Sequence, residues 1–187
     1  MGYALIIIDM QEDFFKNPVL NQKRHLLVGG INALTAICRN AGVPIIWITQ
    51  EFEPDLHDAF MIMRENNIYK TIRGTEGCRI LSELNRNPKD LHVVKKRYSA
   101  FYKTNLEETL NTHGIDTLVL AGINTHACVR MTAVDAYQRD YKVILAKDCI
   151  ASYDDDFHKE SLRYLTGYIS EALDNKEIEK IVAGSKF

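Results

Sequence analysis

The chain has 187 residues, of which 46% are hydrophobic and 26% are charged, and its formal net charge is −2 at pH 7. This length and composition are typical of one globular domain with its own core. The small net charge gives no electrostatic reason to expect nucleic acid or an anionic membrane as a partner. No apolar run approaches the ~20 residues of a membrane span.

The first residues run directly into an apolar stretch and lack the basic residues that open a signal peptide, so we expect a cytoplasmic protein. The four cysteines are widely spaced, without a CxxC motif, which favours reduced thiols over disulfides or a metal centre. We expect no cofactor. The cysteines are Cys38, Cys78, Cys128 and Cys149.

Apolar runs too short for helices alternate with segments whose apolar residues recur at helical spacing. The predicted strands are 4–8, 43–49, 91–95, 117–121, 142–146 and 168–173. The predicted helices are 24–41, 76–84, 105–113, 124–140, 156–166 and 174–183, and residues 50–74 are irregular. This alternation predicts a three-layer α/β/α sandwich around a mostly parallel, six-stranded, Rossmann-like sheet. We interpret residues 1–187 as a single domain.

The stretch LVLAGINTHACVR, residues 118–130, combines the end of a buried strand with the start of a helix. It places Cys128 in the first helical turn, at the edge of the sheet where open α/β folds bind ligands. The positive end of the helix would favour the thiolate form of Cys128. Alternatively, Cys128 is a small hydrophobic core residue, as many free cysteines are.

Two other strand ends deliver charged residues to the same edge, namely Asp9 from one strand and Lys95 or Lys96 from another. One interpretation is an ion pair that closes the sheet edge. The other is an activated cysteine, with Asp9 as the base and a lysine that holds the negative charges together. Spacing alone does not choose between Lys95 and Lys96.

Three segments closely resemble the isochorismatase-like cysteine hydrolase superfamily, which includes nicotinamidases, N-carbamoylsarcosine amidase, ureidoacrylate hydrolases and isochorismatases. They are IIIDMQEDFF (6–15), VVKKRYSAFYKTNL (93–106) and the segment 121–154 that begins AGINTHACVR. The resemblance covers nearly the whole chain in order.

This resemblance implies Asp9, Lys95 and Cys128 as catalytic residues, because the family leaves one residue between its lysine and an Arg-Tyr-Ser sequence. It also implies a cis peptide at Ile123–Asn124 and an oxyanion hole formed by the backbone N–H groups of Asn124 and Cys128. The expected activity is hydrolysis of a C–N bond in an amide, ureide or carbamoyl compound through a thioester.

Nicotinamidases carry an Asp-x-His metal motif after the second strand. Residues 49–57 read TQEFEPDLH, so Glu51-Phe52-Glu53 follows the strand directly and an Asp-x-His comes only later, at Asp55-Leu56-His57, which disfavours nicotinamidase activity. Glu51, Glu53 and His57 could still hold a divalent ion, although solvated loop residues are the alternative. Isochorismatases proper lack the cysteine, so vinyl-ether hydrolysis is a second alternative. A non-catalytic Rossmann-like binding module is disfavoured because no GxGxxG sequence follows a strand.

We expect a small-molecule substrate whose contacts include residues of the three motifs. These are Gln11, Phe14, Arg97, Tyr98 and His126. Phe14 could equally be a core residue, and Arg97 could pair with a surface acid.

Together with Arg130, Arg97 would favour a negatively charged or strongly polar substrate. The apolar cluster at Phe52 and residues 60–63 needs cover from its own domain or from a second subunit. With the family resemblance, it predicts a homo-oligomer.

Overall fold

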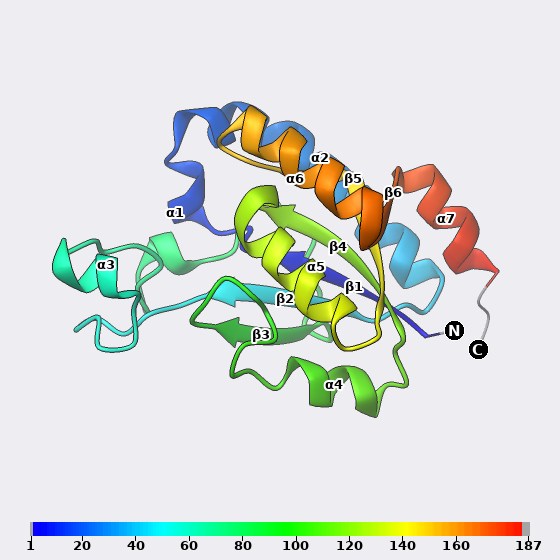
Figure 1. Ribbon diagram of the computed structural model, residues 1–187, viewed down its shortest axis with the longest axis horizontal. Coiled ribbons are helices and arrows are strands. Elements are labelled where there is room, and N and C mark those ends of the chain that lie inside the picture. Colours follow the sequence, from blue (N-terminus) through cyan, green and yellow to red (C-terminus); the bar gives the residue numbers. More distant parts are fainter. Residues whose placement is uncertain (1, 185–187) are drawn as a thin grey trace.

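The computed structural model describes residues 2–184 and contains one six-stranded parallel sheet in the order β3-β2-β1-β4-β5-β6 (Figure 1). This α/β architecture confirms the predicted fold class. The strands are β1 (Tyr3–Ile8), β2 (Ile45–Gln50), β3 (Leu91–Lys95), β4 (Thr117–Ile123), β5 (Lys142–Ala151) and β6 (Ser170–Leu173).

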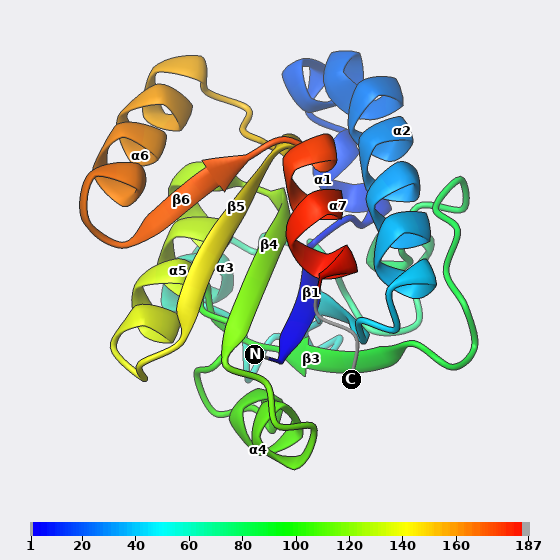
Figure 2. The ribbon, with the colours of Figure 1, turned by 90° about the vertical axis from the view of Figure 1, so that its right-hand side faces the viewer.

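Helices cover both faces of the sheet (Figure 2). One face packs against α2 (Pro18–Asn40) and α7 (Asn175–Ala183). The other packs against α4 (Leu106–Thr112), α5 (Arg130–Tyr137) and α6 (Asp155–Tyr168). Each layer therefore has its own hydrophobic core on one side of the shared sheet.

The central strand β1 shows why the sheet is buried on both faces. All six of its residues are buried, and successive side chains point to opposite faces. Leu5 and Ile7 pack in the core under α2, whereas Ile6 and Ile8 pack in the core under α5. Burial of each such side chain stabilises the fold by about 1.5–3 kcal/mol, so β1 is fixed in place up to Asp9.

Several predicted element boundaries were wrong. Helix α2 begins at Pro18, where Asn17 caps it by accepting hydrogen bonds from the Val19 and Leu20 N–H groups. Its first turns lack a strong apolar stripe, which hid them from the periodicity argument. Helix α6 continues through Gly167 to Tyr168, and β5 runs on to Ala151 past a register shift opposite β4.

The predicted helix at 76–84 is also wrong, since only a 3-10 turn, η1 (Glu76–Cys78), forms there. Leu81 and Leu84 are nevertheless buried, because this segment lies against the loop after β1, where the Leu81 N–H donates to the Met10 carbonyl at 2.9 Å. A short helix, α1 (Glu12–Phe15), was not predicted.

Residues 51–75, between β2 and η1, lie beyond the carboxyl ends of the strands and include α3 (Met61–Glu65) (Figure 1). They form a third, small core, made of Phe52, Leu56, Ala59, Met63 and Ile72. This core covers part of the apolar cluster within the chain, while Met61 and Ile62 remain exposed. The homo-oligomer stays a prediction. No helix among the described residues is long and apolar enough to cross a membrane.

Candidate active site

Asp9, Lys95 and Cys128 lie together at the carboxyl edge of the sheet. The Lys95 Nζ is 2.8 Å from an Asp9 carboxylate oxygen and 3.3 Å from the Cys128 sulfur. Asp9 and Lys95 are fully buried, and Cys128 is 3% exposed. The ammonium of Lys95 therefore contacts residues from two other segments that are distant in sequence.

Strand alternation explains why Lys95, and not Lys96, occupies this position. Lys95 is the last residue of β3, and its ammonium pairs with Asp9, which directly follows β1. Lys96 lies partly exposed and pairs with Asp58 at 2.7 Å. The structure thus places beside Asp9 the lysine that the family resemblance indicated.

A glycine permits the close approach of the segments that carry Asp9 and Cys128. Gly122 in β4 lies beside Ile8 with φ of 107°, and a Cβ atom there would lie 2.0 Å from the Ile8 carbonyl oxygen. Any side chain would push β4 away from the end of β1. Asp9 follows Ile8 immediately, so Gly122 sets its distance from the turn that holds Cys128.

The turn that carries Cys128 is π-helical, η2 (Thr125–Val129), and leads into α5. The peptide between Ile123 and Asn124 is cis, which confirms that prediction. The N–H groups of Ala127 and Val129 donate to the Asn124 carbonyl at 3.0 and 3.2 Å. Cys128 is therefore held on a tightly bonded backbone turn at the end of β4.

Lys95 is the charged partner of this cluster. Burial opposes its charging, but the Asp9 carboxylate and the Cys128 sulfur outweigh burial and raise the pKa of Lys95 above its usual range. A buried ammonium is tolerated only when such a partner compensates it. Lys95 and Asp9 therefore form a buried ion pair with the thiol beside it.

The thiol of Cys128 differs from the sequence-based expectation. Burial raises its pKa to about 12, the Asp9 carboxylate raises it further, and the Lys95 ammonium only partly offsets them. The expected stabilisation of the thiolate by a helix N-terminus is therefore outweighed. At neutral pH Cys128 is a protonated thiol that needs a base to become a nucleophile.

Cys128 and Asn124 lie at a pocket of about 510 Å³ between the 51–75 segment and the loop after β5. The pocket includes the predicted residues Phe14, Tyr98 and His126. Its remaining lining residues were not predicted: Gln50, Phe60, Ile62, Met63, Ile68, Lys70, Ala127, Met131, Tyr153 and Phe157. Most of them are apolar or aromatic, as is usual for small-molecule sites.

His126 lies in an aromatic wall of this pocket. Its ring makes an edge contact with Tyr153 at 4.9 Å between centroids and contacts Phe157 at 5.4 Å. Its Nδ1 atom bonds to the Ser152 hydroxyl, and burial lowers its pKa. His126 is thus a neutral, oriented wall residue.

Gln11, which was predicted to contact the substrate, is not among the residues that line the pocket. Its amide Nε2 donates to the carbonyls of Gln50 and Cys78, each at 2.8 Å, and its Oε1 accepts from the Gln50 N–H at 2.9 Å. Backbone carbonyls therefore take both Nε2 hydrogens of this fully buried amide, and its Oε1 atom already accepts one hydrogen bond. Gln11 instead joins the end of β2 to η1.

The two arginines expected near the substrate also lie outside the pocket lining. Arg97 donates to the carbonyls of Asp58 and Lys96 and stacks over the Phe60 ring at 5.0 Å. Arg130 lies over Tyr164, on α6. The cation in the pocket is Lys70, which no motif or periodicity in the irregular 50–74 region indicated.

A family model described as the isochorismatase domain matches residues 3–177. The chain belongs to the isochorismatase family. Among curated relatives of this family, "Probable inactive nicotinamidase At3g16190" of Arabidopsis thaliana is 32% identical over 85% of each chain. Ureidoacrylate amidohydrolase RutB of Methylobacterium radiotolerans is 28% identical, covering 89% of this chain and 75% of that protein.

Solved structures of the isochorismatase family agree with the fold. N-carbamoylsarcosine amidase from Thermoplasma acidophilum superposes with a TM-score of 0.82 at 28% identity, covering 96% of this chain and 99% of that chain. The similarity therefore extends over nearly the whole molecule.

Some members of the isochorismatase family are expected to hold a metal, and the candidate ligands here do not fit one. Arg73 pairs with Glu51 at 2.8 Å and with Glu53 at 2.7 Å. His57 pairs with Asp55 at 2.6 Å on the exposed surface. Within residues 2–184, no three or more His, Cys, Asp or Glu side chains gather in an arrangement suited to a metal ion.

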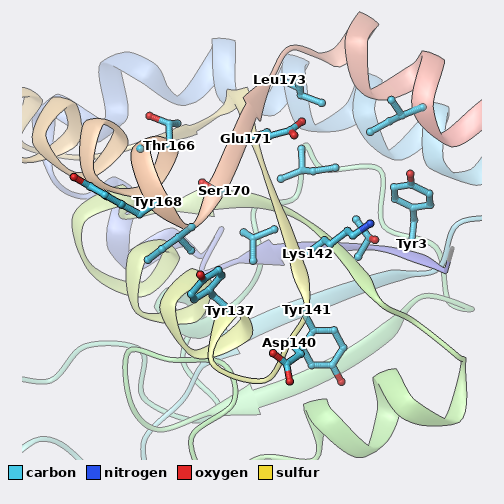
Figure 3. Close-up of a pocket in the computed structure, with 16 residues that line it drawn as sticks. Tyr3, Tyr137, Asp140, Tyr141, Lys142, Thr166, Tyr168, Ser170, Glu171 and Leu173 are labelled. Carbon is cyan, nitrogen blue, oxygen red and sulfur yellow. The ribbon is translucent and has the colours of Figure 1, made fainter.

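A second, larger hollow of about 850 Å³ lies at the opposite edge of the sheet (Figure 3). The first residues of four strands line it, namely Tyr3 of β1, Thr117 of β4, Lys142 of β5 and Ser170 of β6. Its lining contains several tyrosines but no cysteine or histidine. In this isochorismatase-family protein, Cys128 and the larger hollow therefore lie at different ends of the sheet.

Proposed function

We propose that this protein is a cysteine hydrolase that cleaves a C–N bond in a small amide, ureide or carbamoyl compound. The observation that carries the proposal is the contact of one ammonium, Lys95 Nζ, with both Asp9 at 2.8 Å and Cys128 at 3.3 Å. The names of two similar proteins, an N-carbamoylsarcosine amidase and a ureidoacrylate amidohydrolase, support the same bond type.

In the first half of the reaction, Asp9 accepts the thiol proton as the Cys128 sulfur attacks the carbonyl carbon. The raised pKa of Cys128 supports this role for Asp9, because the thiol does not ionise by itself at neutral pH. Lys95 neutralises the negative charge that moves between Asp9 and the sulfur. The backbone N–H groups of Asn124 and Cys128 are proposed to bind the tetrahedral oxyanion.

Collapse of the tetrahedral intermediate breaks the C–N bond and leaves an acyl group on Cys128 as a thioester. Asp9, now protonated, gives its proton to the departing nitrogen. In the second half, Asp9 accepts a proton from water, whose oxygen attacks the thioester carbon. The C–S bond then breaks, the proton returns to Cys128, and the acid product leaves. The chain's own residues supply every proton transfer, so the proposed mechanism uses no cofactor.

The pocket supports a small molecule as the substrate. Its volume of about 510 Å³ and its aromatic lining suit a compound of modest size. Phe14, Tyr98 and His126 are proposed to contact the substrate. Gln11 and Arg97 are not, because neither of them lines the pocket.

The test is ammonia release from a panel of carboxamides, ureides and N-carbamoyl compounds. Cys128→Ala is expected to reduce turnover by more than about 10³-fold, since the nucleophile is lost. Cys78→Ala is the matched control, because Cys78 is a half-buried thiol outside the pocket. Rapid acid quench followed by mass spectrometry is expected to show an acyl adduct on Cys128.

Cys128→Ser separates the proposal from the vinyl-ether alternative. A serine hydroxyl in this cluster is a far weaker nucleophile, so a C–N hydrolase loses its activity. An enzyme that retains near-full activity as Cys128→Ser, and consumes a vinyl ether without an acyl adduct, would contradict the proposed function.

A further inference from the structure

One cation lies in the pocket without an anionic partner. The Lys70 ammonium stacks over the Phe14 ring, 4.2 Å from its centroid, and forms no ion pair with any carboxylate of the described residues. Lys70 is half-buried, and burial is the main cause that lowers its pKa. The Lys70 ammonium is therefore already partly removed from water, and no carboxylate at ion-pair distance offsets the free-energy cost of that desolvation.

The neighbouring residue holds Lys70 in place. The Thr71 N–H donates to Asp13 at 2.6 Å, and its hydroxyl donates to the Lys70 carbonyl at 2.7 Å. The Thr71 carbonyl accepts from the Phe52 N–H at 2.9 Å, and Thr71 is fully buried with φ of 53°. These bonds anchor the backbone from which the Lys70 side chain enters the pocket.

The nearest acid to this segment is already engaged. Asp13 also pairs with Lys16 at 2.6 Å, so its carboxylate binds Lys16 and the Thr71 backbone rather than the Lys70 ammonium. Lys95 is likewise occupied by Asp9 and Cys128. Lys70 is thus the cation of the pocket that remains available to a ligand.

We propose that Lys70 is a specificity-determining residue that binds an anionic group of the substrate, most simply a carboxylate. The proposal rests on the proposed hydrolase function and names its substrate class: an amide, ureide or carbamoyl compound that also carries a negative charge. The scissile carbonyl lies against Cys128 while the anion pairs with Lys70 above Phe14. The other walls of the pocket are mostly apolar. A neutral analogue of the substrate would therefore lack the ion pair with Lys70 and would find no equivalent contact elsewhere in the pocket.

The test uses two alkylating probes that differ in charge and need no turnover. Iodoacetate and iodoacetamide both react with Cys128 when its sulfur displaces iodide from the CH₂ carbon and the thiol proton passes to water. The two rate constants at Cys128 are measured by peptide mass spectrometry. Both depend on the thiolate fraction in the same way, so this fraction cancels from their ratio. Cys78, read in the same digest, reports alkylation outside the pocket.

The expected result is a loss of about tenfold or more in the iodoacetate-to-iodoacetamide ratio for Lys70→Met, and near-normal behaviour for Lys70→Arg. Lys103→Met is the matched control, because Lys103 also lies over an aromatic ring, Tyr102, but outside the pocket. An unchanged iodoacetamide rate shows that each variant keeps its folded pocket. Equal ratios in wild type, Lys70→Met and Lys103→Met would overturn the proposal.

Turnover gives an independent second measurement. For N-carbamoylglycine and its methyl amide, Lys70→Met is expected to raise the KM of the charged compound selectively and to change kcat little. If the wild type hydrolyses neither compound nor any other member of the panel, the proposed function fails while the alkylation ratio still tests Lys70. If the wild type prefers the neutral member of every matched pair, the assignment of Lys70 fails while the hydrolase function stands.

Discussion

The strand ends and the 51–75 segment build opposite sides of one pocket in different ways. Asp9, Lys95 and Cys128 lie at or beyond the carboxyl ends of strands, and their positions follow from sheet register and from Gly122. Lys70 lies on an irregular segment held by a small core and the bonds of Thr71. The proposed chemistry thus depends on the rigid sheet, whereas selectivity depends on a locally assembled wall.

The largest effect is expected at the sheet edge, for Lys95→Met. Removal of the buried ammonium leaves the Asp9 carboxylate as an uncompensated buried charge and removes the group that holds Asp9 beside Cys128. Ammonia release should fall by orders of magnitude. The free energy of unfolding should drop by up to about 3–5 kcal/mol in urea titrations.

Two further variants sharpen this result. Lys96→Met removes a partly exposed ion pair with Asp58 and should change stability by at most about 1 kcal/mol, with activity nearly unchanged. Asp9→Asn combined with Lys95→Met removes both buried charges, so it should recover stability without recovering activity. Strong inactivation by Lys96→Met and a mild effect of Lys95→Met would contradict the assignment.

The second prediction concerns the pH dependence of Cys128. Because burial raises its pKa to about 12, the thiolate fraction at neutral pH is small and grows about tenfold per pH unit. The rate of iodoacetamide alkylation at Cys128 should therefore keep rising from pH 7 to pH 10. Glutathione in the same buffers is the control, since an ordinary thiol levels off near its pKa of about 8.5–9. A plateau at Cys128 below pH 8 would show that Lys95 and the helix N-terminus dominate after all.

The difference between the two regions also explains how much the sequence predicted. Parallel strands of alternating buried residues fix which edge Asp9, Lys95 and Cys128 share, so the fold class and the cluster could be inferred. Spacing could not choose Lys95 over Lys96, and the family resemblance was needed for that. The pKa of Cys128 was expected in the wrong direction, because burial depends on packing that no local pattern reports.

The wall of the pocket was harder to predict. Lys70 is positioned by its own contact with Phe14 and by the bond of the neighbouring Thr71 to Asp13. Both partners lie more than fifty residues earlier in the chain, and these contacts follow no period. Gln11 and Arg97 were assigned to the substrate because they belong to motifs. In the structure neither lines the pocket, and the Gln11 Nε2 and Arg97 Nη1 atoms donate to backbone carbonyls instead. Motif membership therefore indicates a structural requirement as readily as contact with a ligand.

The third prediction concerns Gly77, whose substitution should disturb the pocket wall that carries Lys70. A Cβ atom on Gly77 would lie 2.2 Å from the Asp13 carboxylate, which the Thr71 N–H and Lys16 hold in place. Gly77→Ala should displace Asp13, loosen the backbone next to Lys70 and lower the iodoacetate preference by several-fold. The iodoacetamide rate at Cys128 should remain within about twofold, since the sheet edge is untouched, and stability should fall by about 1–2 kcal/mol.

Gly29→Ala is the matched control for this variant. Gly29 lies in α2, where a Cβ atom would meet nothing within 4 Å, so alanine should be neutral or stabilise the helix by about 0.5–1 kcal/mol. If Gly77→Ala kept the wild-type iodoacetate-to-iodoacetamide ratio, the position of the Lys70 side chain would not depend on the Asp13–Thr71 contact.

The smallest effect is expected from metal removal. A divalent ion at Glu51, Glu53 and His57 would have to displace Arg73 from both glutamates and draw in a histidine that is paired with Asp55 on the surface. None of these three residues lines the Cys128 pocket. Exhaustive dialysis against EDTA should therefore leave ammonia release and the thermal midpoint unchanged, and Glu51→Gln or Glu53→Gln should cost at most about 1 kcal/mol. If activity were lost with EDTA and restored by zinc, iron or manganese, the 51–75 segment would carry a metal-dependent, nicotinamidase-like chemistry. The division between a catalytic sheet edge and a selective wall would then no longer hold.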